Sequence, residues 1–369
     1  MSLAEILRRY QQPLLAQYGS QLSTEQRRAI QAILRCHTPQ AGQLEYVCPD
    51  CDRHTLINHS CGHRSCPQCG HTHNQQWLQR QQQKLLPSHY YLITFTLPQQ
   101  LRGLAQQHQR SVYRLLMRCA VDTVQMFAGN DKQLGGKLGI TAVLHTHARN
   151  LDYHPHVHLI VSAGCIVDSH DSHQDIGWRQ KDSRYLFNGK ALGKAFRGKF
   201  LAGLAEAGLR SHKTPPKKWH AHCKGAGQGS PALIYLSRYL YRGVISDNNI
   251  LALKDDCVTY QYQDSKTKRL QRRCEPATLF LWRLLQHVLP KGFHRSRDYG
   301  FVSAAAKRSL EKLQRLLKVH LCVPAQKVSE ILCPCCGHAM NFLAYLTPIK
   351  VLLRNGTSLQ AVTTISTTL

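Results

Sequence analysis

Acidic residues are scarce in this sequence. It contains 21 Asp and Glu among 369 residues, against 48 Lys and Arg, and its formal net charge is +27. Hydrophobic residues make up 43% of the chain, which excludes a disordered polycation or a histone-like tail because such chains have too few apolar residues to build a core. A folded protein with this charge repels itself unless an acidic partner compensates it, so nucleic acid is the expected partner.

Segments that would direct the chain into a membrane are also missing. No run approaches the about 18 apolar residues of a spanning helix, and neither end carries a lipidation motif. The first residues, MSLAEILRRY, lack the apolar core of a signal peptide. These absences argue against a membrane surface as the acidic partner, and they predict a cytoplasmic protein. A P-loop is missing too, because GGKLG around Lys137 lacks both the leading glycine spacing and the following Ser or Thr.

Cysteine, in contrast, is abundant. Fifteen cysteines without an export signal indicate metal binding rather than disulfides. Two C-x2-C pairs lie close together, and each pair can supply two thiolates from one turn, so we expect a structural zinc ion on Cys48, Cys51, Cys66 and Cys69. Four thiolates leave no position for water, which argues against a catalytic zinc. A second zinc ion or a different choice of four ligands stays open, because other candidates lie nearby: Cys36, His59, Cys61, His63 and His71.

A second cysteine-rich segment, CPCCG, lies near the other end of the chain. Cys333 and Cys336 have C-x2-C spacing, but they supply only half of a four-ligand site. Cys322 or His338 could complete it, and a buried thiol cluster without metal is the alternative.

The periodicity of apolar residues predicts an α+β protein with a mostly antiparallel sheet. Residues 3–35 have helical spacing, residues 90–97 resemble a strand, and residues 138–147 and 156–164 resemble two strands joined by a turn. We therefore divide the chain into N-terminal helices 1–35, a zinc-binding domain 36–73, a linker helix 74–88, a core 89–300 that contains a short helix 231–242, a C-terminal helix with the CPCCG segment 301–350, and a tail 351–369 that we expect to be disordered.

Histidines open the second of these two strands. In a strand, alternate side chains share a face, so His156 and His158 point to one side while Val157 packs on the other. Two neutral imidazoles on a rigid strand can hold a divalent ion, although a pair of surface histidines would fit the same spacing. Antiparallel pairing of the two strands would place His145 across from this pair as a third ligand, with His147 as the fallback.

Tyrosines occupy the short helix 231–242. Tyr235 and Tyr239 are spaced i, i+4, which places them about 40° apart around the helix axis, whereas Tyr241 points to the opposite side. Arg238 and Arg242 flank the pair and could hold phosphates. Two half-buried core tyrosines are the alternative explanation.

The histidine and tyrosine pairs together suggest chemistry on DNA. A tyrosine hydroxyl has a pKa near 10 and is a poor nucleophile, but it can attack a phosphodiester that a metal ion polarises. The products would be a nicked strand and a covalent phosphotyrosine. Because that linkage conserves the bond energy for rejoining, no ATP is needed, which agrees with the missing P-loop.

Over nearly its full length the chain resembles the transposases of the insertion sequence 91 family, the two-tyrosine HUH rolling-circle transposases. The resemblance rests on several motifs in order: HSCGHRSCPQCG, WLQRQQQKLLPSHYYLITFTLP, HTHARNLDYHPHVHLIVSAG, YLSRYLYR and WRLLQHVLPKGFHRSRDYGF. It implies that the core 89–300 is an HUH nuclease on a ferredoxin-like antiparallel sheet. His156 and His158 would bind Mg²⁺ or Mn²⁺, with His145 as the favoured third ligand, and Tyr235 and Tyr239 would be the paired nucleophiles.

The resemblance also implies the substrate and the partners. These are single-stranded transposon ends and target DNA in the bacterial nucleoid, with a free 3′-hydroxyl left after cleavage. Since no helicase domain accompanies the core, the host would have to displace the strand. We expect the DNA to follow basic side chains: Arg53 and Arg64 in the zinc-binding domain, Arg238 and Arg242 beside the tyrosines, and the segment 266–273.

Two other classes of protein compete with this interpretation. A zinc-dependent DNA-binding protein without catalysis, such as a decayed transposase, would explain the charge and the cysteines but not the histidine and tyrosine pairs. A zinc hydrolase or deaminase would need a glutamate general base, and HPHVHLIVSAG contains no acidic residue.

Overall fold

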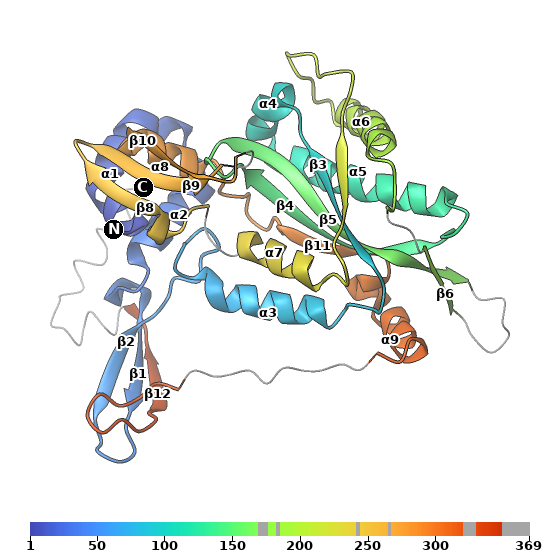
Figure 1. Cartoon of the computed structure of the whole chain (residues 1–369). Helices are drawn as coiled ribbons and strands as arrows, with labels where there is room; N and C mark the ends of the chain where they lie inside the picture. Colours follow the sequence, from blue (N-terminus) through green and yellow to red (C-terminus); the bar gives the residue numbers. More distant parts are fainter. Residues whose placement is uncertain (169–175, 182–184, 241–243, 265–266, 320–329, 349–369) are drawn as a thin grey trace.

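A computed structural model describes residues 1–168, 176–181, 185–240, 244–264, 267–319 and 330–348 (Figure 1). Its centre is a six-stranded sheet in the order β11-β4-β5-β3-β7, with β6 pairing with β5, and every pair of neighbouring strands is antiparallel. The predicted α+β class with antiparallel sheets is therefore confirmed. The strands are β3 (Tyr90–Thr96), β4 (Lys137–His147), β5 (Tyr153–Asp168), β6 (Ile176–Gln180), β7 (Ala221–Gly225) and β11 (Ser296–Tyr299).

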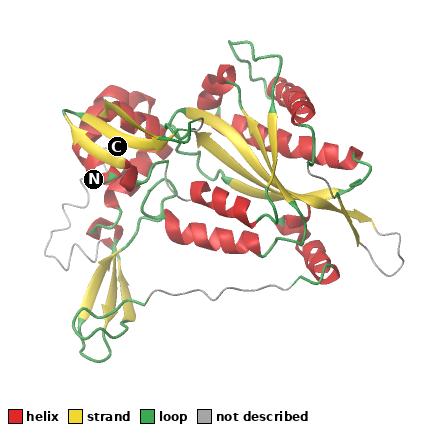
Figure 2. Ribbon diagram, viewed as in Figure 1, coloured by secondary structure: helices red, strands yellow, loops and turns green. Residues whose placement is uncertain are grey.

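Helices cover both faces of this sheet (Figure 2). On one face, α5 (Gln109–Asn130) and α6 (Gly189–Glu206) pack on the sheet, and the short α4 (Arg102–Gln107) precedes them. The period-2 pattern supplies the core beneath, since Leu144 of β4 and Val157 and Leu159 of β5 all point to this face and are fully buried.

The opposite face is covered by two helices that pack on each other. These are α3 (Gly70–Gln82) and α7 (Ser230–Leu240). Val143 and Ile160 point from the sheet toward them, into a small core that includes Trp77, Leu233 and Leu236. The structure thus starts the linker helix, expected from residue 74, at Gly70, and it makes Ser230 the first residue of the tyrosine helix.

A second core lies beside the sheet and combines the N-terminal helices with residues 244–288. It is built from α1 (Leu3–Tyr18), α2 (Thr24–Arg35), α8 (Ala277–Leu285) and a small sheet of β8 (Ile250–Lys254), β9 (Cys257–Gln263) and β10 (Leu270–Pro276). Capping boxes at Ser2 and Ser23 begin the first two helices, and the rings of Tyr18 and Trp282 stack at 4.7 Å.

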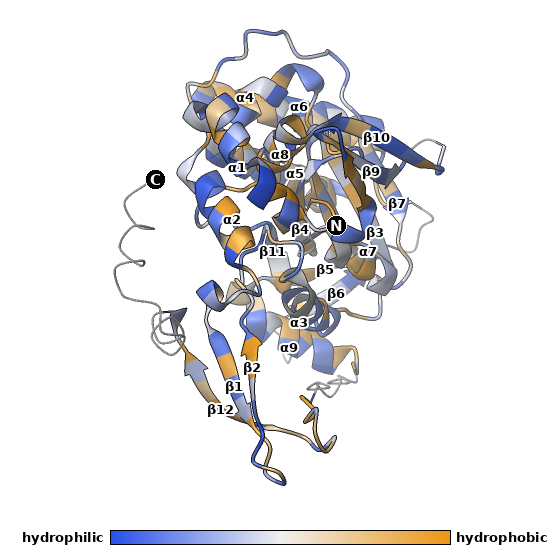
Figure 3. Cartoon of the chain, turned by 90° about the vertical axis from the view of Figure 1, so that its left-hand side faces the viewer, coloured by the Kyte–Doolittle hydropathy of each residue, from blue (hydrophilic) through white to orange (hydrophobic). Residues whose placement is uncertain are grey.

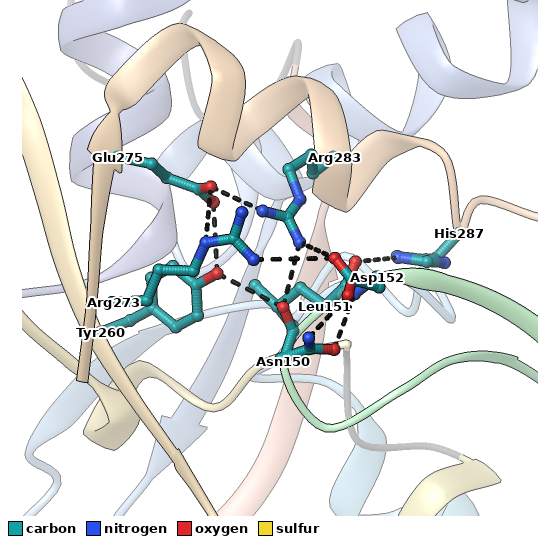
Figure 4. A network of polar contacts seen from close by, with 8 residues as sticks. All are labelled: Asn150, Leu151, Asp152, Tyr260, Arg273, Glu275, Arg283 and His287. Atoms are coloured by element: carbon teal, nitrogen blue, oxygen red, sulfur yellow. Dashed lines mark hydrogen bonds and ion pairs between the residues drawn. The ribbon is translucent and has the colours of Figure 1, made fainter. Parts of the chain in front are cut away.

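Polar contacts connect this second core to the turn between β4 and β5 (Figure 4). Arg283 donates hydrogen bonds to Glu275 and Asp152, both at 2.6 Å, and to the carbonyl of Asn150 at 3.1 Å. Arg273 lies 3.2 Å from Glu275, and the hydroxyl of Tyr260 donates to Glu275 at 3.3 Å. The turn is therefore fixed by residues more than a hundred positions away along the chain.

A three-stranded ribbon extends from the rest of the molecule (Figure 3). It consists of β1 (Gln43–Val47), β2 (His54–Asn58) and β12 (Asn341–Leu346), in the order β12-β1-β2. Strand β12 follows α9 (Lys307–Leu316) in the chain and returns to pair with β1, so the C-terminal CPCCG segment lies beside the N-terminal cysteines. In the described part of the chain, no helix is long and apolar enough to cross a membrane.

Candidate active site and metal centres

Three histidines converge on the face of the central sheet that α7 covers. His145 of β4 pairs directly with His156 of β5, and His158 lies two residues further along β5. The ligand nitrogens of the three side chains all lie within 4.8 Å of one another, close enough to share one metal ion. The predicted alternation brings His156 and His158 to one side of the strand, opposite Val157.

Hydrogen bonds orient two of the three imidazoles. The Nδ1 atom of His156 lies 2.7 Å from the carbonyl of His154, and because a carbonyl only accepts, this nitrogen is the donor and Nε2 keeps its lone pair for a ligand. The Nδ1 atom of His158 lies 2.7 Å from the hydroxyl of Thr94 on β3. Such contacts fix ring orientation in the manner of the outer shell of a metal site.

Burial keeps these imidazoles neutral. It lowers the pKa of His156 to about 4 and the pKa values of His145 and His158 well below their ordinary value, with the neighbouring histidines adding to the shift of the latter two. Neutral imidazole is the form that binds a metal ion. The site is therefore in its ligand form at neutral pH.

His147, the fallback ligand, lies outside this group. The register between β4 and β5 shifts between His145 and His147, and such an irregularity re-aims the side chains that follow it. The ring of His147 instead faces the ring of His287, at 5.3 Å between centroids. His147 thus lines the same cleft as the three converging histidines, but it is not among the nitrogens that lie within 4.8 Å of one another.

Helix α7 brings Tyr235 to the histidines. Gly229 precedes the helix with a φ of +89°, and an added Cβ would lie 2.9 Å from the ring of Tyr90, so glycine is required where the chain turns into the helix. The ring of Tyr235 then lies 6.3 Å from that of His158 and is 37% exposed. Tyr239 follows one turn later on the same helix, but its side chain and that of Arg238 are not described, and Arg242 lies outside the described residues.

The histidines and Tyr235 form one wall of a cleft of about 710 Å³. Thr94 and Thr96 of β3 belong to the same wall. The other wall comes from the second core and from the β4–β5 turn, and it carries neutral polar and aromatic side chains together with one arginine: Arg149, Asn249, Gln261, Tyr262 and Gln263. A flexible polymer strand could enter such a cleft with a phosphate against one wall and its bases against the other.

The cysteines form two clusters, which corrects the expected grouping. Cys66 and Cys69 do not join Cys48 and Cys51; they lie with Cys36 and Cys61, with both Cys36 and Cys61 at 3.4 Å from the sulfur of Cys69. The physical reason is that Cys48 and Cys51 lie in the turn of the β1–β2 hairpin, whereas the other cluster comes from the segments before β1 and after β2, at the opposite end of the hairpin. Of the alternates, Cys36 and Cys61 are thus brought to a cluster, whereas the Nδ1 of His59 donates to the carbonyl of Ser60.

The second cluster joins the two halves of the sequence. Cys48 and Cys51 lie with Cys333 and Cys336, at 3.4 Å between the sulfurs of Cys48 and Cys336 and 3.6 Å between those of Cys51 and Cys333. Sequence reasoning missed this combination. The chain contains three C-P-x-C half sites, and pairing the first two with each other left the third, at Cys333 and Cys336, without a partner.

Each cluster contains a thiol that ionises readily. A hydrogen bond with Cys66 lowers the pKa of Cys61 to about 5. Hydrogen bonds from the backbone N–H groups of Cys336 and Cys335 lower the pKa of Cys333 to about 6. Four sulfurs at these separations match the tetrahedral ligand set of a structural zinc ion.

The two zinc-domain arginines have different surroundings. Arg53 is exposed in the turn between β1 and β2. The guanidinium of Arg64 is half-buried and donates to the backbone carbonyls of Leu289, Pro290 and Phe293. Arg64 therefore holds the segment after α8 in place, a contact that its charge alone did not indicate.

Two families of known proteins match the chain. Residues 6–97 match the family described as "Transposase zinc-binding domain", and residues 139–309 match the family described as "Putative transposase". The first range contains the cluster of Cys36, Cys61, Cys66 and Cys69, and the second contains all three converging histidines and Tyr235. Zinc binding by the cysteine-rich region is consistent with this family match and with the cysteine clusters of the structure.

Relatives similar over most of their length carry the same description. A protein of Sinorhizobium fredii named "Putative transposase y4qJ" is 32% identical over 348 residues, covering 88% of this chain and 86% of that protein. The transposase for insertion sequence element IS801 of Pseudomonas savastanoi pv. phaseolicola is 28% identical, covering 86% and 83%. No solved structure gives a significant match. The chain belongs to the transposases of the insertion sequence 91 type, enzymes that cleave DNA.

Proposed function

We propose that this transposase nicks and rejoins single-stranded DNA at the ends of its element, through a 5′-phosphotyrosine intermediate formed in the cleft. The observation that carries the proposal is the convergence of His145, His156 and His158 beside Tyr235. Among the possible metal-ligand clusters of the described residues, only this one consists of histidines.

The expected divalent ion suits the three histidines. Three imidazoles leave coordination positions for water and a phosphate oxygen, and a bound ion would polarise the scissile phosphate. Mg²⁺ prefers oxygen ligands, whereas first-row transition ions accept imidazole, so of the two expected ions this ligand set favours Mn²⁺. Thr94 and the carbonyl of His154 would hold two of the rings in their binding orientation.

A tyrosine of the chain then accepts the phosphoryl group from the DNA strand. The hydroxyl oxygen of Tyr235 or Tyr239 forms a bond with the phosphorus and loses its proton, while the bond from phosphorus to the 3′-oxygen of the preceding nucleotide breaks. That oxygen takes up a proton and becomes a free 3′-hydroxyl. In the reverse direction a 3′-hydroxyl attacks the phosphotyrosine, which rejoins a strand without ATP. Two tyrosines one turn apart allow two such linkages in succession, as rolling-circle transposition requires, with strand displacement supplied by the host.

The test is formation of a covalent adduct. Purified protein incubated with labelled single-stranded DNA from an element end should give a detergent-resistant adduct, at a lower concentration of Mn²⁺ than of Mg²⁺. The double variant Tyr235→Phe, Tyr239→Phe should give none, while Tyr185→Phe should react like the unaltered protein because Tyr185 is exposed and lies outside the cleft.

Either of two results would reject the assignment. An adduct that persists in the double variant would mean that another nucleophile is used. Salt-sensitive DNA binding with no adduct in the unaltered protein would identify a DNA-binding protein without catalysis instead.

A further inference from the structure

A second large groove lies apart from the cleft. It has a volume of about 770 Å³ and runs between α3, strand β11 with the segment before it, and α9, and it shares no lining residue with the cleft. Its charged lining is six basic and two acidic side chains: Arg64, Arg80, Lys84, Arg295, Arg297, Lys307, Asp298 and Glu311.

The two acidic side chains are already engaged. Asp298 accepts hydrogen bonds from Lys84 at 2.5 Å, Gln81 at 3.0 Å and Thr141 at 2.7 Å. Glu311 lies 3.8 Å from Lys307, but Lys307 is 81% exposed, so water screens this pair. The groove therefore keeps a clear excess of positive charge, and Arg80 and Lys307 on its two opposing helices are exposed to an incoming ligand.

The aromatic residues of the groove are not available for stacking. Trp77 is 4% and Phe293 is 2% exposed, and the indole nitrogen of Trp77 donates to Ser296. The face of the Phe293 ring lies 5.7 Å from the guanidinium of Arg297. Proteins that read or hold bases use exposed aromatic platforms, whereas proteins that hold phosphates use arginine and lysine.

The groove ends close to the histidines. The carbonyl of Arg295, which lines the groove, accepts a hydrogen bond at 2.9 Å from the backbone N–H of Leu144, the neighbour of His145. Ser296 of β11 pairs with Val143 on the same strand. The groove therefore lies beside β4, the strand that carries His145 of the cleft.

We propose that this groove is a second DNA site, which binds the phosphate backbone and does not read bases. The proposal rests on the DNA substrate of the family and not on the phosphotyrosine chemistry, so the two can fail separately. It predicts that the groove contributes to affinity equally for any DNA sequence.

The variant Arg80→Gln, Lys307→Gln tests this by removing one exposed charge from each side of the groove. Binding to single-stranded DNA would be followed by fluorescence anisotropy over a series of KCl concentrations without added divalent ion. Each lost phosphate contact should reduce the slope of log K against log salt by about 0.7, so the double variant should lose about 1.4. The matched control is Lys190→Gln, Lys194→Gln, two exposed charges on α6, which packs on the opposite face of the central sheet.

The control separates a local site from a general effect of net charge. A slope reduced by the groove variant but not by the α6 variant supports the site, and equal slopes for the two variants would overturn it. A scrambled oligonucleotide should show the same reduction, and loss of the effect on that oligonucleotide would contradict recognition by phosphates alone. Adduct formation by the groove variant at saturating DNA tests the proposed chemistry independently.

Discussion

Replacing Arg283 with methionine should destabilise the second core and move one wall of the cleft. Arg283 is 14% exposed, and its partner Glu275 is 4% exposed. Methionine keeps much of the side-chain volume but removes the hydrogen bonds to Glu275, to Asp152 and to the carbonyl of Asn150. Among the described residues, the buried carboxylate of Glu275 then keeps Arg273 and Tyr260 as partners.

The size of the effect follows from the burial of each partner. The contact with Asp152 involves a side chain that is 51% exposed, so its loss costs about 1 kcal/mol or less. Breaking a buried ion pair by removing one partner typically costs about 3–5 kcal/mol. Because Arg273 remains 3.2 Å from Glu275, we expect a value at the lower end of this range, about 3 kcal/mol.

Two assays measure the consequence. Urea unfolding followed by the fluorescence of Trp282 in α8, with the other three tryptophans replaced, should show a lower midpoint for the second core. Adduct yield on single-stranded DNA should also fall, since Arg149 and Leu151 of the turn line the cleft. The double variant Arg283→Met, Glu275→Gln should recover much of the stability because no unpaired charge stays buried. A loss below about 1 kcal/mol, or no recovery in the double variant, would refute the reasoning.

Two further predictions concern the metal sites. Cys336→Ser should reduce the zinc content measured by elemental analysis from two equivalents to one, whereas Cys335→Ser, which changes a neighbour outside both clusters, should leave two. Thr94→Val removes the hydroxyl that contacts His158 and should raise the Mn²⁺ concentration required for half-maximal adduct formation by about 10–100-fold. Thr96→Val, on the same strand and in the same cleft, is its control, and equal effects of the two valines would count against a specific role for Thr94.

The histidine group was predictable because it depends on local rules. Alternation along one strand places His156 and His158 on a common face, and antiparallel pairing with the preceding strand supplies His145. The same rules did not predict the different position of His147, because no sequence pattern indicates the shift in strand register that follows His145. The helix that carries Tyr235 was also predictable from local signals, and the structure starts it at Ser230, one residue before the expected start.

The cysteine grouping was not predictable from spacing alone. Two C-x2-C pairs near each other in sequence usually share an ion. Here the first pair lies in the turn of the β1–β2 hairpin and the second lies beyond the other end of β2, and the partner of the first pair comes from a segment 282 to 288 residues away. The contacts of Arg64 were not predictable either. Its charge suggested contact with phosphate, whereas the fold shows that its guanidinium donates hydrogen bonds to three backbone carbonyls.

The segment that matches the zinc-binding family, residues 6–97, contributes to the central sheet as well as to the cysteine clusters. That match ends at residue 97 and so includes β3, which pairs with β5 inside the central sheet and carries the hydroxyl beside His158. It also includes most of α1 and all of α2, which share a core with α8 and β9 and thereby support the far wall of the cleft. The zinc-binding region is therefore built into both walls of the cleft. Loss of its metal should disturb the cleft as well as any DNA contact of the ribbon, so a deletion of this region cannot isolate a DNA-binding role from a catalytic one.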